Sequence, residues 1–107
     1  MEAVVWYYKT PNMEYVGDLK YHWELDLSWP NDFDDVFHVE LGSAPTLTLK
    51  ACINKCEWCF DQFNEGELRD RVPRSMSVGD VVQFGEIALR CEPNGWSQLV
   101  GDEWRKI

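Results

Sequence analysis

The chain has 107 residues and a formal net charge of −9, and 45% of its residues are apolar. These values indicate one folded domain spanning residues 1–107, and they exclude both a disordered chain and a large enzyme barrel. The acidic balance disfavours direct binding to nucleic acid, because phosphate contacts need clustered Lys or Arg.

The N-terminal part of the chain predicts strands. Residues 3–8 are branched and aromatic, and a second extended piece is expected at 13–16. Apolar and polar residues alternate over 20–27, which predicts a half-buried strand. Residues 28–35 are rich in acids and turn formers, so we expect a loop there, followed by a strand at 36–41.

Residues 47–64 predict the most regular element, an amphipathic helix. Thr46 or Thr48 can cap its first turn, and Gly66 can end it as a left-handed C′ residue. At about 100° per residue, the apolar side chains share one stripe. The stripe consists of Leu49, Cys52, Cys56, Cys59, Phe60 and Phe63. Trp58 lies opposite its centre, where either a neighbouring segment covers it or it is an exposed contact residue.

The C-terminal third predicts a hairpin and a last short strand. Strands at 81–84 and 87–91 flank the turn Gly85-Glu86, and a strand at 96–100 precedes a polar tail. The expected fold is α+β: a mostly antiparallel sheet of five or six strands with one amphipathic helix packed on a face. The predicted core comprises Leu49, Phe60, Phe63, Val82, Phe84, Ile87, Leu89 and Trp96.

The sequence motif Arg-Ser-Met-Ser-Val-Gly-Asp-Val-Val at 74–82 is part of a pattern that resembles a known family. It follows a helix that ends in Phe63-Asn64 and then Pro73, and it precedes a hairpin and the segment Gly95-Trp96-Ser97-Gln98-Leu99. In this order the pieces resemble the YodL-like family, small domains of bacterial genomes, plasmids and phages. The resemblance covers 36–100 as a core and leaves 1–35 as family-variable strands. It implies a mobile-element or phage origin and supplies no activity.

The motif at 74–82 can also be interpreted as a structural strand-entry device, that is, a segment that fixes the backbone where the chain enters the following strand. Gly79 can take a positive φ where the chain enters the strand, and Ser77 and Asp80 can bond nearby backbone groups. Arg74 has five donors for carbonyls or a carboxylate. The alternative is recognition of a ligand or partner. The motif residues are Arg74, Ser75, Ser77, Gly79 and Asp80.

The cysteines raise two hypotheses about cofactors. The spacing of Cys52, Cys56 and Cys59 is that of a radical S-adenosylmethionine cluster, but that chemistry needs a loop and a barrel. Zinc could use the same residues with Cys91 as a fourth thiolate. Structural zinc sites usually draw ligands from knuckles and turns, and free cysteine is a common core residue. We therefore expect core cysteines, with no metal and no cofactor.

No catalytic set is predicted. His22 and His38 lie on the polar faces of expected strands, and no motif marks a nucleophile beside either. The acids in and around the 28–35 loop could form an acid–base pair or a calcium site, but the loop lacks the calcium-site spacing, and we expect a solvated acidic loop. These acids are Glu24, Asp26, Asp32, Asp34 and Asp35.

The leading hypothesis is a non-enzymatic phage or mobile-element accessory protein that binds a basic surface of a host protein. Its narrower forms are an anti-defence inhibitor and a DNA mimic. The expected contact residues are Glu24, Asp26, Trp29, Asp32, Asp34, Asp35 and Trp58. The alternatives are a small enzyme or ligand-binding module with a pocket near Arg74 to Asp80, and a virion assembly accessory protein.

The sequence also predicts the compartment. The first residues lack the basic stretch and long apolar core of a signal peptide, and no apolar run approaches the length of a membrane span. We expect a cytoplasmic protein, located in the host-cell cytoplasm if it is phage-encoded, with reduced thiols and no membrane contact.

Overall fold

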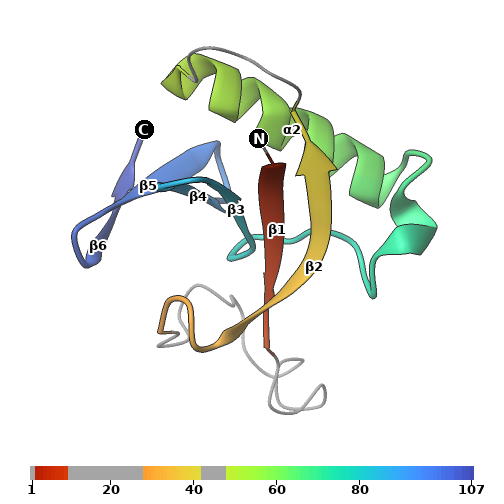
Figure 1. Ribbon diagram of the computed structural model, residues 1–107, viewed down its shortest axis with the longest axis horizontal. Coiled ribbons are helices and arrows are strands. Elements are labelled where there is room, and N and C mark those ends of the chain that lie inside the picture. Colours follow the sequence, from red (N-terminus) through yellow and green to blue (C-terminus); the bar gives the residue numbers. More distant parts are fainter. Residues whose placement is uncertain (1, 10–27, 42–47) are drawn as a thin grey trace.

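The computed structural model describes residues 2–9, 28–41 and 48–107. One six-stranded sheet runs in the order β2-β1-β3-β4-β5-β6, and every neighbouring pair is antiparallel (Figure 1). A single α-helix in the described residues, α2, crosses one face of this sheet, so the predicted α+β architecture is confirmed. The elements are β1 Glu2–Tyr8, β2 Phe33–Glu40, α2 Leu49–Asn64, the 3-10 turn η2 Arg69–Arg71, β3 Val81–Phe84, β4 Ile87–Cys91, β5 Trp96–Val100 and β6 Glu103–Lys106.

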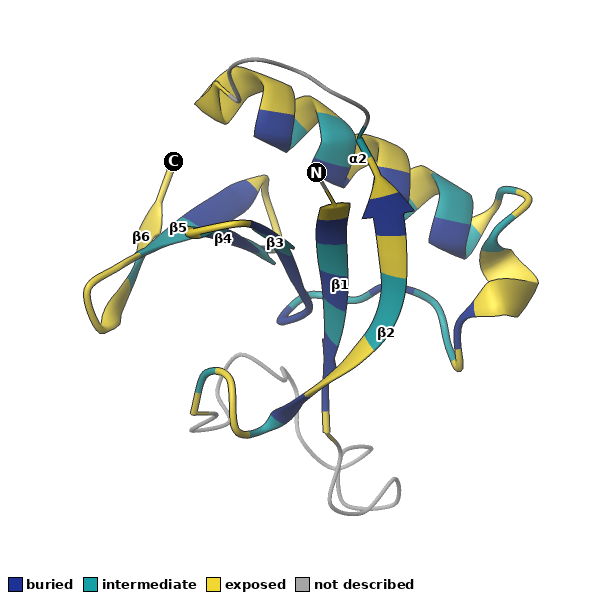
Figure 2. Ribbon diagram, in the orientation of Figure 1, coloured by how far each residue is buried: buried dark blue, intermediate teal, exposed yellow. Residues whose placement is uncertain are grey.

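The alternation of β1 gives the sheet two different faces. Ala3, Val5 and Tyr7 join the cluster that α2 covers, whereas Trp6 and Tyr8 join a cluster on the opposite, outer face. The helix-side cluster is the larger of the two and includes the buried stripe of α2 (Figure 2). The outer cluster consists of Trp6, Tyr8, Trp29, Phe33, Val81, Ala88, Leu99 and Trp104.

The helix begins and packs largely as predicted. Thr48 is the N-cap, and its Oγ1 accepts a hydrogen bond from the backbone N–H of Ala51 at 3.1 Å. The buried stripe consists of Cys52, Cys56, Cys59 and Phe63. The prediction that Leu49 lies in the core is wrong: it is 36% exposed, because the covered part of the stripe starts one turn later, at Cys52. No helix in the described ranges is long and apolar enough to cross a membrane.

Gly66 ends the helix for a different reason than expected. Positive φ angles in the described residues occur only at Gly79, Gly85, Gly95 and Gly101, so the left-handed prediction for Gly66 is wrong. A Cβ at Gly66 would lie 2.8 Å from the Cα of Gln62. The close approach of the chain to the last turn therefore requires glycine.

Strand β2 begins earlier than predicted. Asp34 and Asp35, expected in a loop, are strand residues, because their backbone pairs with β1. The register shifts at this point: Val5 lies opposite Phe37 and Trp6 opposite Asp35, so the intervening Val36 forms a β-bulge. As a result, Asp35 and Phe37 lie on opposite faces of the sheet, although residues two apart in a regular strand share a face.

The C-terminal hairpins complete the sheet. The predicted turn at Gly85-Glu86 is present, with φ +61° at Gly85, and β5 has its predicted bounds. The tail after Gly101 holds a further strand, β6, in which Trp104 pairs with Leu99. The strands predicted at 13–16 and 20–27 lie outside the described residues.

Candidate functional site

The motif at 74–82 forms a buried ion pair at the entry to β3. Nη1 and Nη2 of Arg74 donate to Oδ2 and Oδ1 of Asp80, each at 2.7 Å. Asp80 is fully buried and also accepts from the backbone N–H groups of Ser77 at 2.7 Å and Tyr8 at 3.2 Å. Burial raises the pKa of the Asp80 carboxyl, and these four donors oppose that effect. The pair ties the end of β1 to the start of β3.

The other motif residues also serve local structure. Gly79 has φ +100°, as predicted, and its N–H donates to the carbonyl of Cys91 at 2.9 Å. The carbonyl of Ser75 accepts from Nη1 of Arg74 at 3.0 Å and from Oγ of Ser77 at 3.4 Å. Each residue of the phrase singled out from the sequence thus has a partner within the fold, which supports its interpretation as a strand-entry device.

A hollow of about 460 Å³ lies beside Arg74. The guanidinium carbon is 4.3 Å from the ring centroid of Tyr7 and 4.4 Å from that of Tyr8, and Asp80 compensates its charge. Lys9 at the rim is 3.6 Å from Asp34. The hollow is lined by Tyr7, Tyr8, Lys9, Asp34, Val36, Pro73 and Arg74. It lies where a ligand pocket was hypothesised, but both of its cations already face carboxylates.

The four cysteines are free and buried. Burial raises the pKa of Cys59 to about 11 and that of Cys91 to about 12, so both are neutral thiols near neutral pH. In the described part of the chain, no three His, Cys, Asp or Glu side chains form a group that could hold a metal. The cysteines pack as small apolar residues between α2 and the sheet.

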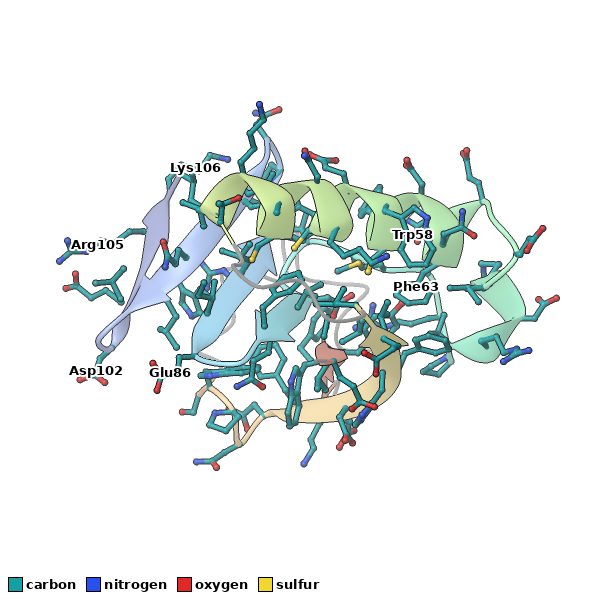
Figure 3. The ribbon with its side chains drawn as sticks, turned by 45° about the horizontal axis from the view of Figure 1, so that its top comes forward. Trp58, Phe63, Glu86, Asp102, Arg105 and Lys106 are labelled. Carbon is teal, nitrogen blue, oxygen red and sulfur yellow. The ribbon has the colours of Figure 1, made fainter. Side chains whose placement is uncertain are left out.

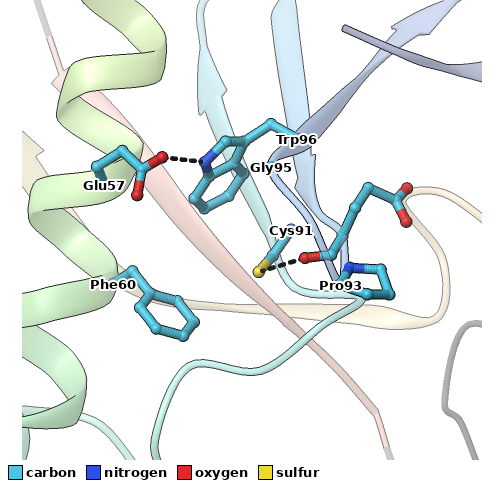
Figure 4. A pocket seen from close by; sticks show the side chains of 7 residues that line it. Glu57, Phe60, Cys91, Pro93, Gly95 and Trp96 are labelled. Atoms are coloured by element: carbon cyan, nitrogen blue, oxygen red, sulfur yellow. Dashed lines mark hydrogen bonds between the residues drawn. The ribbon is translucent and has the colours of Figure 1, made fainter.

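A smaller hollow of about 180 Å³ separates α2 from the β4–β5 turn (Figure 4). Glu57 reaches across it and accepts a hydrogen bond from the indole N–H of Trp96 at 3.3 Å. The thiol of Cys91 points to the carbonyl of Glu92 at 3.8 Å. Among the described residues that line this hollow there is no imidazole, and the protonated thiol of Cys91 faces a carbonyl acceptor, so these residues do not form an activated nucleophile.

The three described acids of the predicted acidic loop do not share one face. Asp32 accepts a hydrogen bond from the backbone N–H of Ser28 at 2.7 Å and fixes the turn before β2. Asp34 lies opposite Tyr7 and Asp35 opposite Trp6, so the two side chains point to opposite faces of the sheet. Glu24 and Asp26 lie outside the described residues.

The bulge instead gathers a different acidic group on the outer face. His38 lies between two carboxylates, with Nδ1 3.1 Å from Glu2 and Nε2 3.3 Å from Asp35. The hydrogen bond with Glu2, and then that with Asp35, raise the pKa of His38. Glu40 lies opposite Glu2 in the register. We call Glu2, Asp35, His38 and Glu40 the β1–β2 acidic patch. The sequence did not indicate it, because the bulge determines that Asp35 and His38 share a face of the sheet.

The two tryptophans predicted to contact a partner have different surroundings. Trp58 is 38% exposed on α2, and Nζ of Lys55 lies 3.9 Å from its ring centroid. Trp29 is half-buried and packs edge-on against Trp6 at 5.3 Å and Trp104 at 6.2 Å. Trp104 was not singled out from the sequence, because the strand that positions it was not predicted.

Comparisons with known proteins do not place this chain in a family. No protein-family model matches the chain, and neither a curated protein nor a solved structure does.

Proposed function

We propose that this chain is a non-enzymatic accessory protein of a phage or mobile element that binds a basic surface of a host protein. The resemblance of residues 36–100 to YodL-like domains motivates the origin, and the net charge of −9 motivates the kind of partner. The observation that carries the proposal is the β1–β2 acidic patch, which lies at the β2 end of the sheet order.

Charge on β2 favours a cationic partner. Three exposed carboxylates, those of Glu2, Asp35 and Glu40, lie on the outer face, and β2 carries no Lys or Arg. At physiological salt the Debye length is about 8 Å, so such a patch attracts a basic surface mainly at close range and speeds productive encounters. The same carboxylates discourage edge-to-edge pairing with another copy of the chain.

The described chemistry supports a binding role over catalysis. Both ring nitrogens of His38 face carboxylates, and the nearest partners of the cysteine thiols are apolar side chains and a carbonyl. A nucleophile needs an adjacent base or a lowered pKa, and the described thiols have raised pKa values.

The test compares two triple variants with equal changes of charge. In the first, Glu2→Gln, Asp35→Asn and Glu40→Gln neutralise the patch. In the second, Asp61→Asn, Glu65→Gln and Glu67→Gln neutralise exposed acids at the end of α2. A partner is first captured from host cells at low salt and identified, and its affinity for each variant is then measured across a salt series.

The proposal predicts that the patch variant loses at least tenfold in affinity and most of the salt dependence, whereas the α2 variant retains both. Equal weakening by the two variants would show attraction to net charge alone. Binding that does not respond to salt, or the absence of a captured partner, would contradict the proposal.

DNA mimicry is a narrower form of this proposal. It requires carboxylates to occupy the phosphate-binding site of a basic partner, so duplex DNA should compete with the chain for that partner. Because Asp34 and Asp35 point to opposite faces, one partner surface contacts only one of them directly. We expect Asp35→Asn to weaken the ability of the chain to displace duplex DNA from the partner more than Asp34→Asn does. Equal effects of the two substitutions would contradict contact through the outer face.

The hollow beside Arg74 favours one alternative, a small-ligand module. Its mainly apolar walls and its volume of about 460 Å³ suit a metabolite with an apolar body. A screen for ligands that raise the melting temperature would test it, with Val36→Trp filling the hollow while leaving the Arg74–Asp80 pair intact. A ligand-induced rise that persists in Val36→Trp would place the ligand elsewhere.

A further inference from the structure

A second hollow, on the outer face of the sheet, has a distinct chemistry. It has a volume of about 440 Å³ and lies between the segment before β2 and the β5–β6 hairpin. Two indole rings form its walls, with centroids 6.2 Å apart and planes at 77°. The lining residues are Ser28, Trp29, Leu99, Gly101, Asp102 and Trp104.

The two indole walls are held in place by their own neighbours. Trp29 packs edge-on against Trp6 at 5.3 Å and against Phe33 at 5.1 Å. The guanidinium carbon of Arg90 lies 4.8 Å from the ring centroid of Trp104, and Arg90 is itself paired with Glu92 at 2.8 Å. Trp104 thus already contacts one cation, Arg90, whose charge Glu92 compensates. Because both indole rings are held in place before binding, a ligand does not lose affinity to the entropic cost of ordering them.

The polar groups of the hollow favour a cation. Asp102, at the tip of the β5–β6 hairpin (Figure 3), has no hydrogen bond or ion pair among the described residues. Among the described residues that line the hollow there is no Lys or Arg, so this lining carries one negative charge beside two electron-rich ring systems. Open space surrounds Gly101, since a Cβ there would meet no atom within 4 Å. The described residues therefore leave the hairpin tip beside Asp102 uncovered at Gly101.

We propose that this hollow binds an alkylated ammonium group. Such a group spreads its charge over methyl groups and is weakly hydrated, so it can leave water, lie against indole faces and stay near a carboxylate. An unmethylated ammonium is more strongly hydrated. A sugar ring is the competing ligand, because the lining side chains also offer one hydroxyl, one carboxylate and two indole N–H groups, and a glucose titration separates the two.

This site does not depend on the proposed function, because small probes test it directly. Tetramethylammonium and choline are titrated into the full chain while the indole N–H resonances of the six tryptophans are followed by NMR. Neopentyl alcohol, a neutral molecule of similar shape, is the control probe. The resonances of Trp29 and Trp104, assigned with Trp29→Phe and Trp104→Phe, should shift with both cations and stay in place with the alcohol.

Asp102→Asn tests the carboxylate without disturbing the core, because the residue is exposed at a hairpin tip. It should weaken choline binding by about threefold, whereas Trp58→Phe on α2 should leave binding unchanged. The proposal is overturned if the alcohol shifts the same resonances, if glucose does, or if the cations shift only the resonance of Trp58.

Two further probes distinguish sources of the group. A short peptide containing trimethyllysine is compared with the same peptide containing lysine, and both are compared with phosphocholine. Tighter binding of the methylated peptide would assign the site to a modified protein tail, and tighter binding of phosphocholine to a choline headgroup. Equal binding of the lysine and trimethyllysine peptides would overturn the proposal, since methylation would then contribute nothing.

Discussion

The two faces of the sheet are built on different principles. On the helix side, α2 covers a continuous apolar cluster that includes three of its own cysteines and Phe63. On the outer side, the same strands carry a smaller aromatic cluster next to an exposed acidic patch. The difference indicates that the helix side supplies most of the stability, whereas the outer side carries the groups on which the proposed binding sites rest.

The largest expected effect separates the two faces directly. Phe63 is fully buried and Trp104 is half-buried. Phe63→Ala should lower the free energy of unfolding by about 3–5 kcal/mol, because it leaves a cavity under α2. Trp104→Ala should cost less than about 2 kcal/mol, since water already reaches that ring. Urea denaturation measures both values, and equal losses would contradict the proposed difference between the faces.

The second prediction concerns the ion pair that joins β1 to β3. Asp80→Asn places an amide N–H₂ against the donors of Arg74 and leaves that cation half-buried without a counter-charge. We expect a loss of about 2–3 kcal/mol, at the low end for a broken buried pair because the Arg74 side chain is 26% exposed. Thermal unfolding should show a clearly lower melting temperature.

A surface pair provides the matched control. Arg105 lies 3.6 Å from Glu103 on β6, and both side chains are largely exposed. Arg105→Ala should change stability by no more than about 0.5 kcal/mol. If Asp80→Asn and Arg105→Ala lowered stability equally, the structural role assigned to the Arg74–Asp80 pair would be wrong.

The ion pair also shows how much of the fold the sequence could predict. The phrase at 74–82 indicated a strand entry, and its residue types identified Arg74 as a donor and Gly79 as the residue with positive φ. The stripe of α2, its Thr48 cap and the Gly85 hairpin were predictable for the same reason: each depends on local spacing and intrinsic preference.

Other features depend on register, which local patterns do not determine. The bulge at Val36 adds one residue to β2, so alternation counted along the strand puts Asp35 and His38 on opposite faces, whereas the structure brings them together. Strand β6 has four residues, of which only Trp104 is apolar, so its pattern was too short to indicate a strand. The β1–β2 acidic patch and the second indole wall were missed for these reasons.

The third prediction concerns a defect within the helix-side core. The hydroxyl of Tyr7 is buried and has no hydrogen-bond partner among the residues that the structure describes. Burial, and then the charge of Asp80, raise the pKa of Tyr7, so the hydroxyl remains a protonated donor without an acceptor. Tyr7→Phe removes this group and should leave stability unchanged or increase it by up to about 1 kcal/mol. A loss greater than about 1 kcal/mol would mean that the hydroxyl has a partner in solution, such as a bound water.

The smallest effect is a pH dependence confined to the outer face. The charged groups that face His38 are Glu2 on β1 and Asp35 on β2, with Glu40 opposite Glu2. These contacts raise the folded-state pKa of His38 above its ordinary value of 6.5. The stability that His38 contributes is therefore fully present below about pH 6.5 and is lost as the pH rises through the raised folded-state pKa.

His38→Gln removes the titrating group and keeps a hydrogen-bonding side chain, so it isolates this contribution. Wild type should have a higher melting temperature than His38→Gln at about pH 6, and the difference should vanish at about pH 9. Titration of the imidazole by NMR provides a second measurement: Glu2→Gln should move the His38 pKa back toward its ordinary value, while Glu86→Gln, at the β3–β4 turn, should not move it. A stability difference that grows with pH would reverse the expected sign and show that the carboxylates do not stabilise the imidazolium in the folded chain.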